Sequence, residues 1–175
     1  MVFYFLRHAS AGKAFPNPAK DERRPLDDEG ILQARYAGRL LANLDVQVDQ
    51  IVSSPLKRAL QTASLVANEL AYEAAVLKHN ALRPEGEWEQ FQQLLLQYRK
   101  YESVMIVGHN PSMAEFLSKI ISGSGAARVE LKKASIAKVE MTGRFGTMQW
   151  LVTPKIARTL QTSLKLSSLP KTSRK

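Results

Sequence analysis

The sequence predicts an α/β fold, a three-layer sandwich in which a mostly parallel central sheet is flanked by helices. Short runs of apolar strand formers alternate along the chain with segments in which apolar residues recur at helical spacing. Several of these runs end directly in polar residues, as expected where ligands bind beyond the carboxyl ends of parallel strands. The length of 175 residues and the 45% hydrophobic content suit a single domain.

The first unit is predicted to consist of a strand, a loop and a helix. Residues 2–6 form an unbroken apolar run, which is typical of a central strand covered on both faces. Residues 12–26 contain three prolines among lysines and arginines, so they are predicted as a surface loop. Asp27 or Asp28 then caps a helix, and residues 50–53 form a short strand after it. The inward face of the helix carries Ile31, Ala34, Ala37, Leu41 and Leu44.

The second unit begins with a clear helix start. Ser54 is a favourable N-cap residue, and Pro55 suits the first position of a helix. Apolar residues at helical spacing extend this helix over residues 55–70. A short strand over 75–78 and a helix rich in Gln and Leu over 87–100 complete the unit.

The third unit repeats this pattern and ends in a hairpin. Residues 103–107 form a second apolar run that is typical of a buried strand. Asn110 then caps a helix whose first residue is Pro111. Residues 135–141 and 147–152 show shorter strand patterns around a glycine-containing turn, which predicts a final hairpin in the sheet.

The net charge of +9 raises the question of a nucleic-acid partner, but its distribution argues against one. Residues 154–175 contain six of the 25 basic residues and no acidic residue, so most of the excess lies there. No basic stripe interleaved with aromatic residues is present in residues 1–153. We therefore expect one domain over residues 1–160 and a basic tail over residues 161–175, which attracts acidic partners.

The chain contains no cysteine, which excludes a thiolate nucleophile, a disulfide framework and cysteine-ligated metal sites. The apolar run at residues 2–6 has no basic leader and no small-residue cleavage site, so it is predicted as a strand and not as a targeting segment. We expect a cytoplasmic protein without a membrane partner.

Two histidines and two arginines are the candidates for chemistry. His8 and His109 each follow a predicted buried strand directly, a placement that is hard to explain for two separate structural histidines. Arg7 follows five apolar residues, and Arg58 lies in the first turn of a helix, where backbone donors already favour an anion. Guanidinium groups at such a site make a seat for phosphate. His79 follows a weak strand in a polar stretch and is interpreted as structural.

Three ordered motifs resemble those of the histidine phosphatase superfamily, also called the phosphoglycerate-mutase-like family, and each follows a predicted strand. They are Arg7-His8-Ala9, Ser53-Ser54-Pro55-Leu56-Lys57-Arg58-Ala59-Leu60-Gln61-Thr62-Ala63 and Val107-Gly108-His109-Asn110. The resemblance runs from residue 1 to about residue 153. The short length and the elements at 24–26 and 82–86 are similar to bacterial phosphohistidine phosphatases of the SixA type.

The resemblance implies a phosphoglycerate-mutase-like fold and a role for each candidate residue. His8 is the nucleophile that becomes phosphorylated, while Arg7, Arg58 and His109 hold the phosphoryl oxygens. A neutral imidazole suits this attack, and the guanidinium groups supply positive charge, so no metal and no cofactor are expected. Ala9 stands where the family usually has glycine, which adds one methyl group to the loop after His8.

The substrate is predicted from the acid that the chain lacks. Family members that act on alcohol phosphates usually carry a glutamic acid where this chain has Pro84, and Glu85 is adjacent to it. An alkoxide needs protonation as it leaves, whereas an imidazole leaves with much less help. The favoured substrate is therefore phosphohistidine in a signalling or phosphorelay protein.

Two alternatives stay open at this point. The first is a phosphatase for small phosphate esters in which Glu85 is the acid. The second is a module that binds phosphoproteins or nucleic acid without turnover. Both histidines and both arginines are present, which argues against lost catalysis.

Overall fold

The computed structural model describes residues 1–167, with side chains described as far as residue 163. One six-stranded sheet has the order β3-β2-β4-β1-β5-β6. Its strands are β1 (Val2–Arg7), β2 (Gln50–Ser53), β3 (Leu77–Lys78), β4 (Ser103–Gly108), β5 (Ile136–Thr142) and β6 (Phe145–Val152). The first four strands are parallel to one another, whereas β5 and β6 form an antiparallel hairpin at the edge beside β1. The expected mostly parallel sheet is confirmed.

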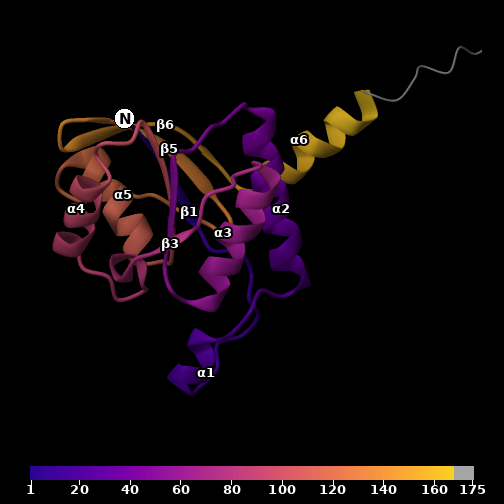
Figure 1. The fold of residues 1–175 in the computed structure, drawn as a ribbon, viewed down its shortest axis with the longest axis horizontal. Helices are drawn as coiled ribbons and strands as arrows, with labels where there is room; N and C mark the ends of the chain where they lie inside the picture. The colour runs from indigo at the N-terminus through magenta and orange to yellow at the C-terminus, as the bar shows by residue number, and fades with distance from the viewer. Residues whose placement is uncertain (168–175) are drawn as a thin grey trace, which may run out of the picture.

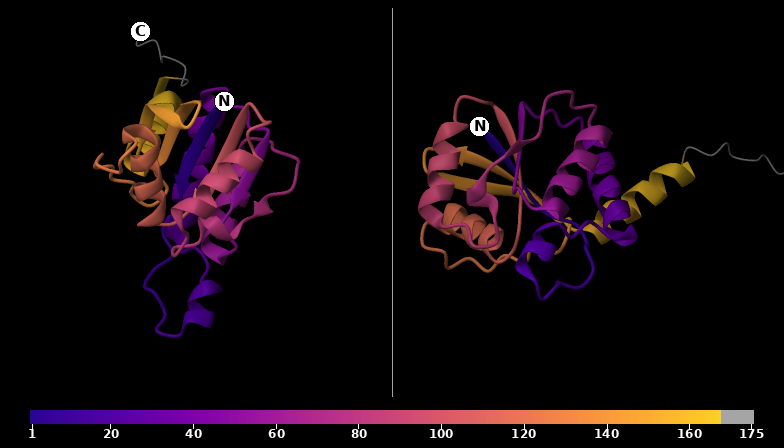
Figure 2. Two further views of the ribbon diagram at one scale, coloured as in Figure 1. Left: turned by 90° about the vertical axis from the view of Figure 1, so that its left-hand side faces the viewer. Right: turned by 60° about the horizontal axis from the view of Figure 1, so that its bottom comes forward.

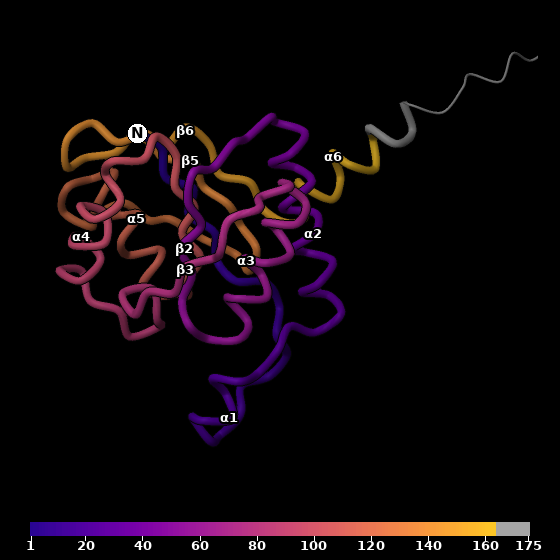
Figure 3. Tube along the Cα trace, viewed as in Figure 1, coloured from indigo at the N-terminus to yellow at the C-terminus, as the bar shows by residue number. Residues whose placement is uncertain are grey.

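Helices cover both faces of the sheet, as Figure 1 and the right-hand view of Figure 2 show. One face carries α4 (Trp88–Gln97) and α5 (Ser112–Ser122), and the other carries α2 (Asp28–Asn43) and α3 (Lys57–Glu69). A short helix, α1 (Pro18–Glu22), projects below the sheet on a long loop, which the trace in Figure 3 follows. A 3-10 turn, η1 (Asn80–Leu82), precedes α4, and the last helix is α6 (Pro154–Ser167).

The alternation of side chains along β1 builds a separate core on each face of the sheet. Phe3 and Phe5 point to the side of α4 and α5, and Tyr4 and Leu6 point to the side of α2 and α3. On the first side Phe91 stacks on Phe116 with their ring centroids 4.4 Å apart. Because both faces are covered, the central strands are apolar throughout, which explains the unbroken runs in the sequence.

The pairing of β1 with β4 places the candidate site at one edge of the sheet. Arg7 is in register with Gly108, and the His8 amide donates a hydrogen bond to the Gly108 carbonyl at 2.9 Å. The Ser54 amide donates to the Val107 carbonyl at 2.8 Å in the same layer. The residues that follow β1, β2 and β4 therefore meet at the carboxyl end of the parallel strands.

Three local expectations were wrong. The proline-rich loop contains the helix α1, because Pro18 takes its first position and the Asn17 side chain accepts a hydrogen bond from the Lys20 amide. Helix α3 begins at Lys57 and not at Pro55, and its N-cap residue is Leu56.

Helix α5 likewise begins one residue after Pro111, at Ser112. The side chains of Ser54 and Asn110, expected as helix caps, form other hydrogen bonds. The Ser54 hydroxyl contacts His109, and the Asn110 amide donates to the Leu131 carbonyl.

Helix α6 continues beyond residue 160, where the tail was expected to begin. It packs on α2, with Ala157 buried, and the buried Gln161 amide donates to the Tyr36 carbonyl at 2.7 Å. Ile156 and Leu160 of the same helix are partly exposed to solvent. Residues 168–175 of the predicted tail lie outside the described residues. Among residues 1–167 no helix is long and apolar enough to cross a membrane.

Candidate active site

The four residues predicted from the sequence meet at the carboxyl end of the parallel strands. Arg7 ends β1, His8 follows it, Arg58 lies in the first turn of α3, and His109 follows β4. His8, Arg58 and His109 are only 8%, 5% and 1% exposed. The imidazole centroids of His8 and His109 are 4.8 Å apart, so both rings face one small volume.

The His8 ring is held in one tautomer. Its Nδ1 lies 2.7 Å from the Ala9 carbonyl oxygen, and since a carbonyl only accepts, Nδ1 is the atom that carries the proton. The neutral ring then has its lone pair on Nε2. Burial lowers the pKa of His8 to about 3, against the Ala9 hydrogen bond that raises it, and the charges of Arg58, Arg7 and Lys133 lower it further. This ring therefore stays neutral at physiological pH.

His109 is fixed through the other ring nitrogen. Its Nε2 shares a hydrogen bond of 2.9 Å with the Ser54 hydroxyl, which also accepts a bond of 3.3 Å from the Leu56 amide. Burial, followed by the nearby His8 and Arg58, lowers the pKa of His109 to about 2. Its Nδ1 is buried and has no hydrogen-bond partner among residues 1–163.

The two arginines are each tied to the protein at one end of the guanidinium group. Arg58 Nη1 donates to the Asp21 carbonyl at 3.0 Å and lies 3.3 Å from its carboxylate, so α1 folds against the site. Arg7 Nη1 donates to the Leu131 carbonyl at 2.8 Å. The Nε atoms of both arginines are buried without a partner in the part of the chain whose side chains are described.

These unpaired nitrogens point to an anion as the ligand of the site. Buried polar nitrogens are nearly always hydrogen-bonded in folded proteins, so three of them without a partner in one cluster call for an explanation. Arg7 and Arg58 add positive charge, and a guanidinium group matches the oxygens of a phosphoryl group. The same cluster holds a neutral imidazole with an available lone pair, so the arrangement can bind a phosphoryl group beside a nucleophile.

Thr62 is a supporting residue that the sequence analysis did not single out. Its hydroxyl accepts a hydrogen bond of 3.1 Å from the Ala9 amide and donates one of 2.7 Å to the Arg58 carbonyl. One buried side chain therefore couples the loop after His8 to the first turn of α3. Thr62 lies four residues after Arg58, one helical turn away, which is the only sequence signal for this role.

The loop after His8 is anchored a second time at the start of α2. The Asp27 carboxylate accepts hydrogen bonds from the Ser10 hydroxyl, the Gly12 amide and the Gly30 amide at 2.7 to 2.8 Å. A methyl group on Gly30 would lie 1.9 Å from the Ser10 carbonyl oxygen, so this helix turn and the loop are in direct contact. Ala9 is completely buried, and its backbone does not have the positive φ that favours glycine. Alanine is therefore accommodated where the family usually has glycine.

Glu85 is placed differently from the other candidates. Its side chain is 65% exposed and accepts a hydrogen bond of 2.5 Å from Arg83 Nε. This contact holds the pKa of Glu85 below its usual range. The second arm of the Arg83 guanidinium group pairs with Glu22 of α1. A carboxyl group that is held as a carboxylate is a poor proton donor at neutral pH.

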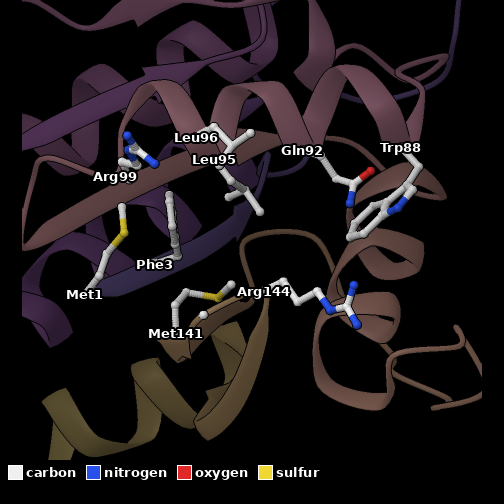
Figure 4. A pocket seen from close by; sticks show the side chains of 10 residues that line it. Met1, Phe3, Trp88, Gln92, Leu95, Leu96, Arg99, Met141 and Arg144 are labelled. Atoms are coloured by element: carbon white, nitrogen blue, oxygen red, sulfur yellow. The ribbon is translucent and has the colours of Figure 1, made fainter.

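An apolar cavity of about 550 Å³ lies near the start of β1, at the opposite end of the parallel strands, and contains none of the candidate residues. Phe3, Trp88, Leu95 and Met141 line it, with Arg99 and Arg144 at its margin (Figure 4). The chemistry-bearing residues are therefore separate from this cavity. Within residues 1–163 no group of three His, Asp or Glu side chains could hold a metal ion.

This fold and site define a phosphoryl-binding α/β protein, and comparison with known proteins gives its family. The profile of the histidine phosphatase superfamily (branch 1) matches residues 3–95, more than half of the chain. An uncharacterised protein of Picosynechococcus sp. is 32% identical over 139 residues, which cover 78% of this chain and 82% of that protein. The chain belongs to the histidine phosphatase superfamily, and this membership supports a phosphatase activity.

Other relatives in this superfamily carry more specific names. The phosphohistidine phosphatase SixA of Escherichia coli is 24% identical over 156 residues, which cover 88% of this chain and 94% of that protein. A structure of the protein histidine phosphatase SixA complexed with tungstate superposes with a TM-score of 0.78 at 24% identity, over 89% of this chain and 98% of that one.

A mitochondrial serine/threonine-protein phosphatase, Pgam5 of Drosophila virilis, is 28% identical over 147 residues. The match covers 66% of this chain but only 51% of Pgam5, so the chain spans about half the length of that relative.

Proposed function

We propose that the protein is a phosphohistidine phosphatase that removes the phosphoryl group from a histidine of a signalling or phosphorelay protein. The observation that carries this proposal is the 2.7 Å contact between His8 Nδ1 and the Ala9 carbonyl oxygen, because it leaves the Nε2 lone pair free to attack phosphorus. The name of the SixA relative, a phosphohistidine phosphatase, supports the choice of substrate.

In the proposed first step, His8 Nε2 attacks phosphorus while the nitrogen–phosphorus bond of the substrate breaks on the opposite side. The electron pair of that bond stays with the departing imidazole, which leaves neutral when its other nitrogen carries a proton. His8 becomes a phosphoimidazolium whose Nδ1 keeps its proton and donates it in the hydrogen bond to the Ala9 carbonyl oxygen. In the second step water attacks phosphorus, inorganic phosphate leaves with the water's proton lost to solvent, and His8 regains its lone pair.

Arg7, Arg58 and His109 are proposed to hold the oxygens of the phosphoryl group. Their buried nitrogens without protein partners support this assignment: the Nε atoms of the two arginines and Nδ1 of His109. Phosphoryl transfer depends on positioning and on stabilising charge in a site that excludes water, which these groups provide. We propose that turnover is independent of metal, so that a chelator such as EDTA leaves the rate unchanged.

The exposed and ion-paired state of Glu85 supports phosphohistidine over an alcohol phosphate. An alkoxide leaving group needs a proton donor, whereas the conjugate acid of imidazole has a pKa of about 6.5 and needs little help. The charge of Arg58 reaches Glu85, but the hydrogen bond from Arg83 is the main cause that holds Glu85 as a carboxylate. The serine/threonine phosphatase among the relatives makes a phosphoester the competing substrate class.

A comparison of substrates with the variant Glu85→Gln separates these two classes. We expect wild-type protein to hydrolyse phosphohistidine faster than para-nitrophenyl phosphate or phosphoserine, and Glu85→Gln to slow phosphohistidine less than about tenfold. Glu87→Gln removes a neighbouring exposed carboxylate and is the matched control. A loss of roughly 10² to 10⁴ on every substrate would make Glu85 a general acid and contradict the proposal.

A further inference from the structure

A groove of about 700 Å³ runs from Arg7, at the candidate site, along α2 to the start of α6. Four further cations line this basic groove, together with two carboxylates. They are Lys132, Lys133, Lys155 and Arg158, with Glu29 and Glu130. Lys132 lies 3.9 Å from Glu130, whereas no ion pair involves Lys133, Lys155 or Arg158 among the residues whose side chains are described.

The cations of the basic groove lie on a framework fixed to the site. Lys155 and Arg158 lie three residues apart on α6, and Ala157 and the Gln161 hydrogen bond to Tyr36 hold that helix on α2. Leu131 accepts the hydrogen bond from Arg7, so the segment bearing Lys132 and Lys133 is tied to the site as well. Excess positive charge therefore extends outward from the place where a phosphoryl group would bind.

The composition of the basic groove favours a protein segment over a nucleic acid. A nucleic-acid backbone presents an unbroken row of phosphates, some of which would face Glu29 and Glu130, whereas a peptide can place uncharged or apolar side chains opposite these two carboxylates and its acidic side chains opposite the cations. Leu32, which is 53% exposed, and Tyr36 give the wall an apolar part, which suits a peptide with acidic and apolar residues. Because the groove starts at Arg7, residues next to a bound phosphorylated residue would pass along it.

We propose that the basic groove docks an acidic segment of the phosphoprotein substrate, next to its phosphorylated residue. This proposal rests on the proposed function for the class of substrate. Docking of this kind raises the association rate and the specificity without changing the chemical step.

Two synthetic peptides test the basic groove, each with one phosphohistidine, flanked on one side by four glutamates or by four glutamines. We expect kcat/KM of the wild type to be about tenfold higher for the glutamate peptide, a preference that falls at high salt. The variant Lys155→Glu/Arg158→Glu should lose this preference and hydrolyse free phosphohistidine at the wild-type rate. The variant Lys100→Glu/Arg144→Glu changes the net charge equally at exposed residues near the opposite edge of the sheet, and should keep the preference.

The outcomes distinguish this proposal from the proposed function. Equal kcat/KM for both peptides in the wild type would overturn the docking proposal while leaving phosphohistidine hydrolysis intact. If only phosphoserine were hydrolysed, the proposed function would be wrong, and the same comparison with phosphoserine peptides would still decide docking. Inhibition by an oligonucleotide but not by polyglutamate, lost in Lys155→Glu/Arg158→Glu, would assign the groove to nucleic acid instead.

Discussion

At the scale of single residues, burial determines the chemistry of the two histidines. Both rings are almost fully shielded from water and lie near two guanidinium groups. Each ring therefore stays neutral at pH values well below the pKa of a free imidazole. A neutral His8 is a nucleophile, whereas a protonated one is not. Burial also lowers the pKa of Arg7 and of Arg58, because their positive charges are shielded from water. An anion bound beside them would stabilise these charges.

Arg58→Ala is expected to lower kcat/KM by at least about a hundredfold, the order seen when one preorganised charge-stabilising group is removed. The fold should persist, because the hydrogen bond from the Thr62 hydroxyl to the carbonyl of residue 58 does not need the guanidinium group. Lys57→Ala is the matched control, since Lys57 is the exposed neighbour in the same helical turn. A change of less than threefold in Arg58→Ala would reduce Arg58 to a structural charge.

The candidate site residues that follow strands could be predicted from the sequence, whereas the residues that contact them only through the tertiary fold could not. His8 and His109 follow apolar runs, so their position was visible before the fold was known. Asp21, which pairs with Arg58 across 37 residues, lies in a polar stretch with no periodic signal. The hydroxyl of Ser54 was expected to cap a helix, and its bond to His109 depends on the pairing of β2 with β4.

At the scale of elements, the start of α2 fixes the loop that carries His8. Asp27 caps the helix and also binds the loop, and Gly30 allows the helix turn to touch the Ser10 carbonyl. The sequence predicted the cap and the buried Ala34, Ala37 and Leu41 of this helix, but it was wrong for Leu44, which follows the last turn and is exposed. It could not predict the contact with Ser10, since a glycine within a helix does not reveal which backbone it approaches.

Gly30→Ala is expected to destabilise the protein by about 1 to 3 kcal/mol, the range for forcing extra volume into a packed interior. Activity should fall as well, because the loop after His8 must move to relieve the 1.9 Å contact. Gly143→Ala is the control: its φ of +63° strains the backbone, but its added methyl group meets nothing within 4 Å. Chemical denaturation and kcat/KM measure both effects. Unchanged activity and stability in Gly30→Ala would contradict the described junction.

Helix α6 shows where local composition misleads. Its serines, threonines and lysines resemble a tail, yet Gln161 is buried and bonded to α2. The apolar side chains of Ile156 and Leu160 on the same helix are partly exposed to solvent. A polar side chain that satisfies a buried carbonyl carries no signature in the sequence, because its partner lies 125 residues away.

At the scale of the whole molecule, the buried neutral histidines couple stability to pH. Their pKa values lie below that of an unfolded histidine, so the unfolded chain binds more protons as the pH falls through about 6.5. The contribution of these two histidines to the free energy of unfolding is therefore fully present above about pH 6.5 and is lost progressively as the pH falls below it. Carboxylates with a lowered pKa, such as Asp21 and Asp27, lose their contribution to stability only at lower pH. The change in stability between pH 7 and pH 5 therefore comes mainly from histidines.

We expect the free energy of unfolding to fall between pH 7 and pH 5, by on the order of 2 kcal/mol for each of the two buried histidines. Urea denaturation at both pH values measures this change. The variant His8→Asn/His109→Asn removes the two groups and should have a much flatter pH dependence, with His79 as the remaining histidine. Equal wild-type stability at pH 7 and pH 5 would show that the two rings take up protons in the folded protein.

The arrangement of the whole chain joins the two predicted halves of the function. The parallel strands bring the loop after His8, the first turn of α3 and His109 together at their carboxyl ends, and α1 folds against Arg58 from below. On the other side of Arg7, the basic groove leads away from the site. The proposed catalytic centre and the proposed docking surface are therefore adjacent and have Arg7 in common.

The most direct test of the central claim is to trap the phosphorylated enzyme. Wild-type protein is mixed with radiolabelled phosphoramidate, a small donor with a nitrogen–phosphorus bond, quenched in alkali, digested and analysed by mass spectrometry. We predict a phosphoryl group on His8 that is stable in alkali and labile in acid, and neither label nor turnover in His8→Ala. Label on another residue, or full activity in a folded His8→Ala protein, would contradict covalent catalysis by His8.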